Sequence, residues 1–547
     1  MCSDRARFAS DDLPGAQQDA DVMTDAMHSA GRARACGETE QWALQRAPSA
    51  SGGEPRWAAR VVASAGAAMG SAAPARPGWG WGQRARQARR RQCVGIAPRS
   101  GTPRSTPVAT GSVLCLVLTA ALALGGCTTS IPSVSTARGS TAHGGDQATG
   151  TAGKQVGTGA PASTQAAQLE RVVVVFRHGV RAPLQGEAAA AHYADQPWPQ
   201  WSTPASLLTP HGRQGVRLSG EYLRQWLVQQ ALLPSNGCPV TGSVSVWANT
   251  DQRTIDSGAL LADALAPGCG ILAGHREAGS NDPLFRPIEA GTVPFDAAAA
   301  VASIQQQTGG PAALLQGHAA ELQALQQILG CTRTPCEFAQ MPSTLAPSAN
   351  GRGLKLGGPI DLTSGTGEVL LLQYAEGLPL SQVGWGRATP ERLAQVSRLH
   401  ALLFDIYARP HYMASRSGAP LAREVLQRFG DAQAPKVSVF VGSDTHIAAL
   451  SSLLGVHFHL PGYGADDPPP GGALLLGLWR ESDGRQLVRA RYLAQSLDQL
   501  RTLVPLDLAH PPLQQELSLG LCAPEQRMAC PLADFAMALE QQLQLDR

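Results

Sequence analysis

Residues 172–176, VVVVF, are followed directly by residues 177–183, RHGVRAP. Four valines and a phenylalanine in a row carry no charge, and four of the five are β-branched. This pattern is typical of a strand that is buried on both faces of a parallel sheet. In open α/β folds, ligands bind beyond the carboxyl ends of such strands. The sequence therefore predicts an α/β fold with a ligand site at residues 177–183.

The residue types of this segment suit a phosphate group. Arg177 and Arg181, four residues apart, present planar forks of N–H donors that match phosphate oxygens. His178 lies between them, and an imidazole nitrogen can attack phosphorus to form a phosphohistidine. Gly179 allows the backbone to approach closely. An Arg-His-Gly triplet alone would be interpreted as a solvated turn, but the full seven-residue context favours a phosphate site.

The RHGVRAP segment resembles the signature of the histidine acid phosphatases, the branch of the histidine phosphatase superfamily that contains the phytases. The resemblance covers nearly all of residues 168–547 and is strongest to bacterial periplasmic phytases and glucose-1-phosphatases. Eight further segments resemble the family in the same order along the chain: WPQW at 198–201, LTPHG at 208–212, ANTDQRT at 248–254, DPLF at 282–285, VGWGR at 383–387, SRSGAPL at 415–421, GSDTHIAAL at 442–450 and PPPGGALLLGLW at 468–479.

The resemblance implies roles for four more residues. Arg253 corresponds to the third phosphate-binding arginine, and Asp444 to the general acid that protonates the leaving group. An N-cap role for Asp444 at the start of a helix is compatible with acid catalysis. Arg416 and Glu368 lie in segments that match the substrate pocket of the family. For these last two residues, salt bridges within the scaffold are the alternative.

Ser443 departs from the family pattern. The chain has Gly-Ser-Asp-Thr-His at 442–446, where the family typically has Gly-His-Asp-Thr-Asn. The serine leaves one cation fewer at the transferring phosphoryl group, so we expect Ser443 to supply a neutral hydrogen bond and activity to be lower. His446 is disfavoured as a substitute, because residues three apart are neighbours only on a helix. We expect Ser443 to belong to the turn that leaves the strand.

The resemblance also implies the architecture. We expect a phosphoglycerate-mutase-like three-layer α/β sandwich with a smaller, mainly helical cap inserted at roughly 290–365. The Ala-, Gln- and Leu-rich residues 311–330 are typical of helix. The cleft between sheet and cap would then hold the phosphate, and the cap would select the substrate.

The expected activity is phosphomonoester hydrolysis through a phosphohistidine, without a metal or cofactor. The substrate would be a small phosphorylated molecule, either an inositol phosphate or a sugar phosphate. Phytases of this type often carry Thr-Lys after the signature, whereas this chain has Leu184 and Gln185, which resembles the glucose-1-phosphatases. We therefore expect a phytase or broad acid phosphatase, with a glucose-1-phosphatase as the alternative. A lipoprotein that binds phosphorylated ligands without turnover is a third possibility.

The N-terminal part of the chain predicts export. Residues 113–124 are an apolar run, too short to span a membrane, and residues 124–127, LGGC, resemble a bacterial lipobox. We expect residues 94–127 to be a lipoprotein-type signal, with lipidation at Cys127 and a periplasmic protein anchored to the outer membrane only by its lipid. An ordinary cleaved signal is the alternative. Residues 128–167 predict a flexible linker. Residues 1–93 are expected to be an unstructured or doubtful extension.

Six cysteines follow Cys127, and an even number in an exported chain favours disulfides. Proximity in the sequence favours Cys331–Cys336 and Cys522–Cys530, which leaves Cys238–Cys269. A metal site at Cys331 and Cys336 is disfavoured because it would require a reducing compartment and nearby histidines.

The net charge of +2 excludes a polyanion-coating protein, so no nucleic-acid partner is expected. Residues 1–110 contain 15 arginines and no lysine against nine acidic residues. The basic excess therefore belongs to the front of the chain, and the expected catalytic unit at 168–547 is slightly acidic.

Overall fold

The computed structural model describes residues 167–331 and 336–544. The expectations for residues 1–93 and 94–127, for the linker up to residue 166 and for lipidation of Cys127 fall outside the described residues. In the part of the chain that is described, no helix combines the length and apolar character needed to cross a membrane.

A mixed eight-stranded sheet forms the centre of the structure, in the order β10-β8-β7-β1-β6-β2-β3 with β9 also paired to β8. Strands β1, β6, β2 and β3 run parallel, whereas β7 is antiparallel to β1, and β8 is antiparallel to β7, β9 and β10. The bounds are β1 Gln168–Arg177, β2 Val244–Ala248, β3 Gly274–His275, β6 Val437–Gly442, β7 Ala473–Arg480, β8 Gln486–Ala494, β9 Leu513–Leu517 and β10 Cys530–Pro531.

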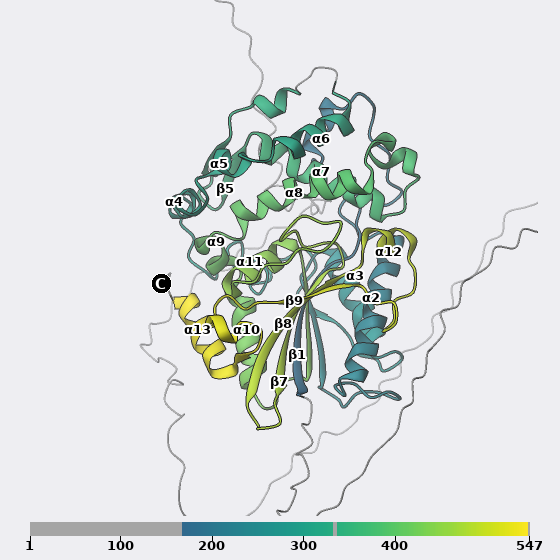
Figure 1. The fold of residues 1–547 in the computed structure, drawn as a ribbon, viewed down its shortest axis with the longest axis vertical. Coiled ribbons are helices and arrows are strands. Elements are labelled where there is room, and N and C mark those ends of the chain that lie inside the picture. The colour runs from purple at the N-terminus through teal and green to yellow at the C-terminus, as the bar shows by residue number, and fades with distance from the viewer. Residues whose placement is uncertain (1–166, 332–335, 545–547) are drawn as a thin grey trace, which may run out of the picture. The chain divides into compact units, whose positions relative to one another are not determined.

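Both faces of this sheet are covered by helices, which confirms the α/β sandwich (Figure 1). Because strand side chains alternate between faces, Val172 and Val174 pack into one core with α2 and α3, whereas Val173 and Val175 pack into another with α10, α11 and α13. The valine run is thus buried on both faces, as predicted. The bounds are α2 Pro210–Gln229, α3 Gln252–Leu265, α10 Ala419–Gly430, α11 Asp444–Leu454 and α13 Leu532–Gln544.

A second, mainly helical layer lies beyond one end of the sheet (Figure 1). The stretch 290–365, where we expected the cap, contains α4, α5, α6 and a two-stranded hairpin, and the helical layer continues through α7, α8 and α9. The helix expected at 311–330 is divided in two, because Gly317 has a φ of 90°. The bounds are α4 Ala297–Thr308, α5 Pro311–Leu315, α6 Ala319–Leu329, β4 Thr344–Pro347, β5 Leu354–Gly357, α7 Pro359–Ala375, α8 Pro390–Tyr407 and α9 His411–Ser417.

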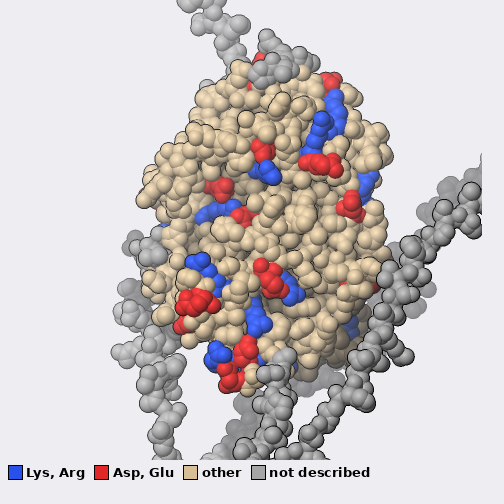
Figure 2. All heavy atoms as spheres, viewed as in Figure 1, with Lys and Arg blue, Asp and Glu red and all other residues tan. Residues whose placement is uncertain are grey.

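The remaining helical segments are short: η1 Ala189–Tyr193, η2 Glu337–Gln340, η3 Leu380–Gly386, α12 Leu497–Thr502 and η4 Pro524–Gln526. Disulfides join the three pairs that sequence proximity favoured, Cys238–Cys269, Cys331–Cys336 and Cys522–Cys530. On the face drawn in Figure 2, acidic and basic side chains lie in small mixed groups and do not form a patch of one sign.

The N-terminus of α2 packs directly against the loop that follows β1. The Thr209 N–H donates to the Val180 carbonyl at 3.1 Å, and the Thr209 hydroxyl accepts from the Gly212 N–H at 2.8 Å. A Cβ added to Gly212 would lie 2.0 Å from the Val180 carbonyl oxygen. Glycine at this position is therefore required for helix α2 to contact the loop at residues 178–181.

We predict that Gly212→Ala pushes the Val180 carbonyl away and lowers the free energy of unfolding by about 1–3 kcal/mol, the usual cost of overpacking. The matched control is Gly430→Ala at the end of α10, where a Cβ would meet nothing within 4 Å. Urea denaturation of both variants measures the difference. Equal midpoints for the two variants would contradict the requirement for glycine at position 212.

Candidate active site

Three neighbouring parallel strands bring the expected site residues to one edge of the sheet. Arg177 at the end of β1 pairs in register with Gly442 at the end of β6. The His178 N–H donates to the Gly442 carbonyl at 3.1 Å, and the Asn249 N–H beyond β2 donates to the Val441 carbonyl at 2.9 Å. The loops after β1, β2 and β6 therefore meet, although they are far apart in the sequence.

His178 lies at the centre of these loops and is almost fully buried. Its Nδ1 is 2.9 Å from the Gly179 carbonyl, which can only accept, so Nδ1 carries the proton. Its Nε2 accepts from Nε of Arg253 at 3.1 Å. Burial and the charges of the surrounding arginines hold the pKa of His178 well below its ordinary value. The imidazole is neutral, with the Nε2 lone pair available as a nucleophile.

Arg177 is fully buried and held by three oxygen groups. Its guanidinium pairs with Glu368, donates to the Pro468 carbonyl and lies 2.8 Å from Oδ2 of Asp444. Burial lowers the pKa of Arg177, but the charges of Asp444 and Glu368 outweigh this effect and raise it. Arg177 is thus a fixed positive charge beside the nucleophile.

Arg181 is held by a carboxylate that the sequence did not single out. Its two terminal nitrogens donate to both oxygens of Glu187 at 2.7 and 2.6 Å. Within the described residues, Nε of Arg181 and Nε of Arg177 are buried and have no hydrogen-bond partner. A buried donor without a partner is costly. These two N–H groups are the ones left to bind an anion.

Asp444 is the first residue of α11, and its carboxyl group is already tightly held. Oδ2 pairs with Arg177, and Oδ1 accepts from the Thr445 N–H at 2.7 Å. Burial raises the pKa of Asp444, but the charges of Arg177 and His400 outweigh it and hold the pKa below its ordinary value. The carboxyl is ionised in this structure.

Arg253 lies in the first turn of α3 and is oriented by a second pair that the sequence did not single out. Asp251 Oδ2 lies 3.3 Å from Arg253 Nη2 and 2.5 Å from Arg286 Nη2. Arg286 is mostly buried and directly follows the DPLF segment at 282–285. Its place directly after the DPLF segment is the one feature of the sequence that could have identified Arg286. Asp251 thus joins two arginines, one of which contacts the nucleophile.

Ser443 precedes α11, and His446 does reach back to it. His446 Nδ1 accepts from the Ser443 N–H at 2.8 Å and lies 3.0 Å from the Ser443 hydroxyl, and its Nε2 donates to the Phe285 carbonyl at 2.8 Å. Burial lowers the pKa of His446 to about 4. The ring is neutral and both nitrogens bind protein groups, so His446 supplies no cation here.

Glu368 and Arg416 lie on different helices. Glu368, on α7, is buried and forms a salt bridge with Arg177. A salt bridge within the scaffold is the alternative role considered for Glu368 above. Arg416 lies on α9 with its guanidinium carbon 4.6 Å from the centroid of the Tyr412 ring. His400 of α8, which the sequence did not single out, lies behind Glu368 at 3.8 Å.

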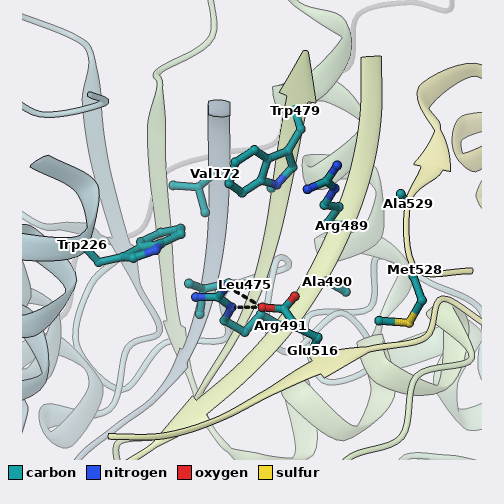
Figure 3. Close-up of a pocket in the computed structure, with 11 residues that line it drawn as sticks. Val172, Trp226, Leu475, Trp479, Arg489, Ala490, Arg491, Glu516, Met528 and Ala529 are labelled. Atoms are coloured by element: carbon teal, nitrogen blue, oxygen red, sulfur yellow. Dashed lines mark hydrogen bonds and ion pairs between the residues drawn. The ribbon is translucent and has the colours of Figure 1, made fainter. Parts of the chain in front are cut away.

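A separate pocket of about 370 Å³ lies over β7 and β8 and shares no lining residue with this site (Figure 3). Its walls include the indoles of Trp226 and Trp479. Its two arginines already pair with carboxylates, Arg491 with Glu516 and Arg489 with Glu481. The charges of both arginines are thus paired by the protein itself, although Nε of Arg489 is buried without a hydrogen-bond partner among the described residues.

Known proteins resemble this chain in sequence and in fold. The family model of the histidine phosphatase superfamily (branch 2) matches residues 168–493. Phytase AppA of Escherichia coli is 33% identical over 404 residues, which cover 68% of this chain and 92% of that protein. Glucose-1-phosphatase of Salmonella typhimurium is 30% identical over 387 residues, covering 67% and 91%.

The fold comparison agrees. The structure of a Hafnia alvei phytase in complex with myo-inositol hexakis sulphate superposes with a TM-score of 0.64 at 32% identity, covering 71% of this chain and 99% of that one. The chain belongs to branch 2 of the histidine phosphatase superfamily and is a phosphomonoester hydrolase.

Proposed function

We propose that this protein hydrolyses phosphomonoesters in two steps through a phosphohistidine at His178. The observation that carries the proposal is the neutral, buried imidazole whose unprotonated Nε2 faces Arg253, with Arg177 and Arg181 on either side in the chain. A nucleophile that stays unprotonated at acid pH can attack phosphorus where an ordinary histidine would be charged.

In the first step, the Nε–H groups of Arg177 and Arg181 bind phosphate oxygens, and the guanidinium of Arg253 releases Nε2 of His178 and donates to the phosphate instead. The Nε2 lone pair of His178 forms the N–P bond while the bond from phosphorus to the ester oxygen breaks, and Asp444 gives its proton to that oxygen. In the second step, water attacks phosphorus and the Asp444 carboxylate takes a proton from the water. The N–P bond breaks, its electron pair returns to His178, and inorganic phosphate leaves.

This mechanism requires Asp444 to be protonated when the substrate is bound. The structure holds Asp444 ionised by means of nearby positive charges. A phosphate group that binds the same arginines brings negative charge, which offsets those cations and raises the pKa of the carboxyl. Binding of the substrate thus supplies the condition under which Asp444 becomes a proton donor.

For the substrate, we favour inositol phosphates or a broad range of phosphomonoesters. Support comes from the similarity to phytases of Escherichia coli and Hafnia alvei. The alternative, a sugar phosphate, is supported by the glucose-1-phosphatase relative and by residues 184–185. The Leu184 N–H donates to Glu187, and Gln185 is exposed and uncharged, so this part of the loop adds no cation for a second phosphate.

We further propose that the protein is exported and held at the outer membrane by a lipid on Cys127. The support comes from the lipobox-like residues 124–127 and from the three disulfides, which persist in oxidising compartments.

His178→Ala is expected to reduce hydrolysis to background, because no other side chain of the mechanism can form the covalent intermediate. Acid quenching of wild-type protein during turnover of a ³²P-labelled ester should trap label on the protein, and the variant should trap none. His457→Ala, which removes an exposed histidine, is the matched control and should label like the wild type. Labelling of the His178 variant would place the nucleophile elsewhere.

Asp444→Asn should separate substrates by their leaving groups. With glycerol 2-phosphate, whose alkoxide needs a proton, we expect kcat to fall about 10²- to 10⁴-fold, the usual contribution of a general acid. With p-nitrophenyl phosphate, whose leaving group departs as a stable anion, the fall should be much smaller. An equal loss for both substrates would show that Asp444 only positions Arg177.

Ser443→His is expected to raise kcat/KM, because it adds a donor that can carry charge beside the transferring group. Steady-state kinetics on glycerol 2-phosphate, compared with Ser443→Ala, give the effect of each group. We expect about a tenfold gain for histidine and a smaller loss for alanine. If both variants match the wild type, position 443 does not limit the reaction.

A further inference from the structure

A buried chain of ionisable groups lies behind the phosphate site, and the mechanism above uses only its outer end. Nδ1 of His400, on α8, lies 2.7 Å from Oδ1 of Asp467 and 3.8 Å from Oε2 of Glu368. All three side chains are more than nine-tenths buried. One imidazole therefore lies between two carboxylates that come from different segments of the chain.

Each of these carboxylates belongs to a segment that holds Arg177. Glu368, on α7, pairs directly with the guanidinium. Asp467 immediately precedes Pro468, whose carbonyl accepts from Nη1 of Arg177. His400 thus connects the two protein segments that, together with Asp444, fix the position of Arg177.

The loop that carries Asp467 is packed closely against α8. A Cβ added to Gly464 would lie 3.1 Å from the Ser397 carbonyl oxygen, and the Tyr463 hydroxyl donates to the Gln495 carbonyl at 2.8 Å. The edge of the His400 ring faces the Phe404 ring, with centroids 5.0 Å apart. Because packing holds both the His400 ring and the Asp467 loop in place, the fold itself brings His400 and Asp467 into contact.

The charges in this cluster require a second cation. Arg177 alone would face the three carboxylates of Glu368, Asp444 and Asp467, and unpaired buried charge is strongly unfavourable. Burial lowers the pKa of His400, but Asp467 and Glu368 outweigh burial and raise the pKa to about 9. His400 is therefore an imidazolium at acid and neutral pH.

Arg181 is a further cation that acts on Asp444 and Glu368, from the substrate side, whereas the tyrosines beside the cluster stay neutral. Burial raises the pKa of Tyr463, in the Asp467 loop, and of Tyr492, on β8, so both phenols remain protonated. His178 is held neutral by burial and by its arginines. The cations that act on the Asp444 carboxyl from behind the site are thus Arg177 and His400.

We propose that His400 is a positioning residue of the phosphate site: as an imidazolium it ties α7 and the Asp467–Pro468 loop together around Arg177, and its charge sets the pH range in which Asp444 donates a proton. This role rests on the proposed function, because it acts through the general acid. It assigns to α8, at the base of the helical layer, a part in catalysis that requires no contact with the substrate.

The direction in which the alkaline limb of kcat moves follows from the charge that each variant removes. His400→Gln removes a cation, so the pKa of Asp444 should rise, and the alkaline limb of kcat should move up by about one pH unit. Asp467→Asn removes the carboxylate that chiefly raises the pKa of His400, so His400 should lose charge and the same limb should also move up, by less than in His400→Gln. His400→Lys restores the cation and should bring the limb back towards that of the wild type.

The experiment compares pH profiles of kcat on glycerol 2-phosphate from pH 3 to 8 for these three variants and the wild type. The substrate is the same throughout, so its own ionisation cancels from the differences. His457→Gln is the matched control, because this exposed histidine pairs with the neighbouring Asp466 at 2.6 Å and should leave the profile unchanged. Upward shifts for His400→Gln and Asp467→Asn, with recovery in His400→Lys, would support the proposal.

Thermal unfolding gives a second measurement that does not depend on activity. Because folding raises the pKa of His400 from about 6.5 to about 9, its stabilisation is complete below pH 6.5 and is lost as pH rises through 9. The Tm of the wild type should therefore fall over this interval more steeply than that of His400→Gln. If His400→Gln does not fold, the upward shift in Asp467→Asn decides the matter.

The possible failures can be distinguished. If the wild type does not hydrolyse glycerol 2-phosphate or p-nitrophenyl phosphate, the proposed function is wrong, and the role of His400 falls with it. If the wild type is active but the folded variants keep the wild-type pH profile, or if His400→Gln and Asp467→Asn shift it downward, only the role of His400 is overturned.

Discussion

The site depends on the parallel pairing of β1 with β6. Because Arg177 lies opposite Gly442, the residues that follow each strand, His178 and Asp444, emerge side by side at the same edge. A slip of one residue would exchange the two faces of β1 and turn Phe176 from the core that it shares with α2 and α3 towards the opposite one. The apolar packing that stabilises the sheet thus also fixes nucleophile and acid relative to each other. Glycine at position 212 lets α2 pack against the loop at residues 178–181, which carries His178.

Charge balance is the second constraint, because buried arginines need buried partners. Each guanidinium of the site has a carboxylate: Glu368 for Arg177, Glu187 for Arg181, and Asp251 for both Arg253 and Arg286. These pairs occupy terminal nitrogens and hold each guanidinium in one orientation. The Nε–H groups of Arg177 and Arg181 are left without partners among the described residues. The protein therefore orients its arginines with carboxylates and keeps the donors that an anion can use.

The sequence was sufficient for features that are local and chemically distinctive. The valine run predicted a strand buried on both faces, and the spacing of the six cysteines favoured the pairs that form. The partners of the arginines could not be predicted in this way, because they depend on folding. Glu368 is 191 residues from Arg177, and the Phe285 carbonyl is 161 residues from His446. Helix α7, which carries Glu368, is buried on nearly all sides, so it shows no one-sided apolar pattern that would mark its inner face.

One set of positive charges has opposite effects on the two catalytic groups. The arginines keep His178 unprotonated and so prepare the nucleophile, but the cations near Asp444 also favour its carboxylate and so suppress the acid. A bound phosphate shifts this balance towards the acid, because its negative charge offsets the cations beside Asp444, whereas burial, the largest cause of the low pKa of His178, remains. Proton donation then depends on occupancy of the site by a phosphoryl group. Ser443 fits this balance, since a further cation beside Asp444 would strengthen phosphate binding and at the same time make the acid harder to protonate.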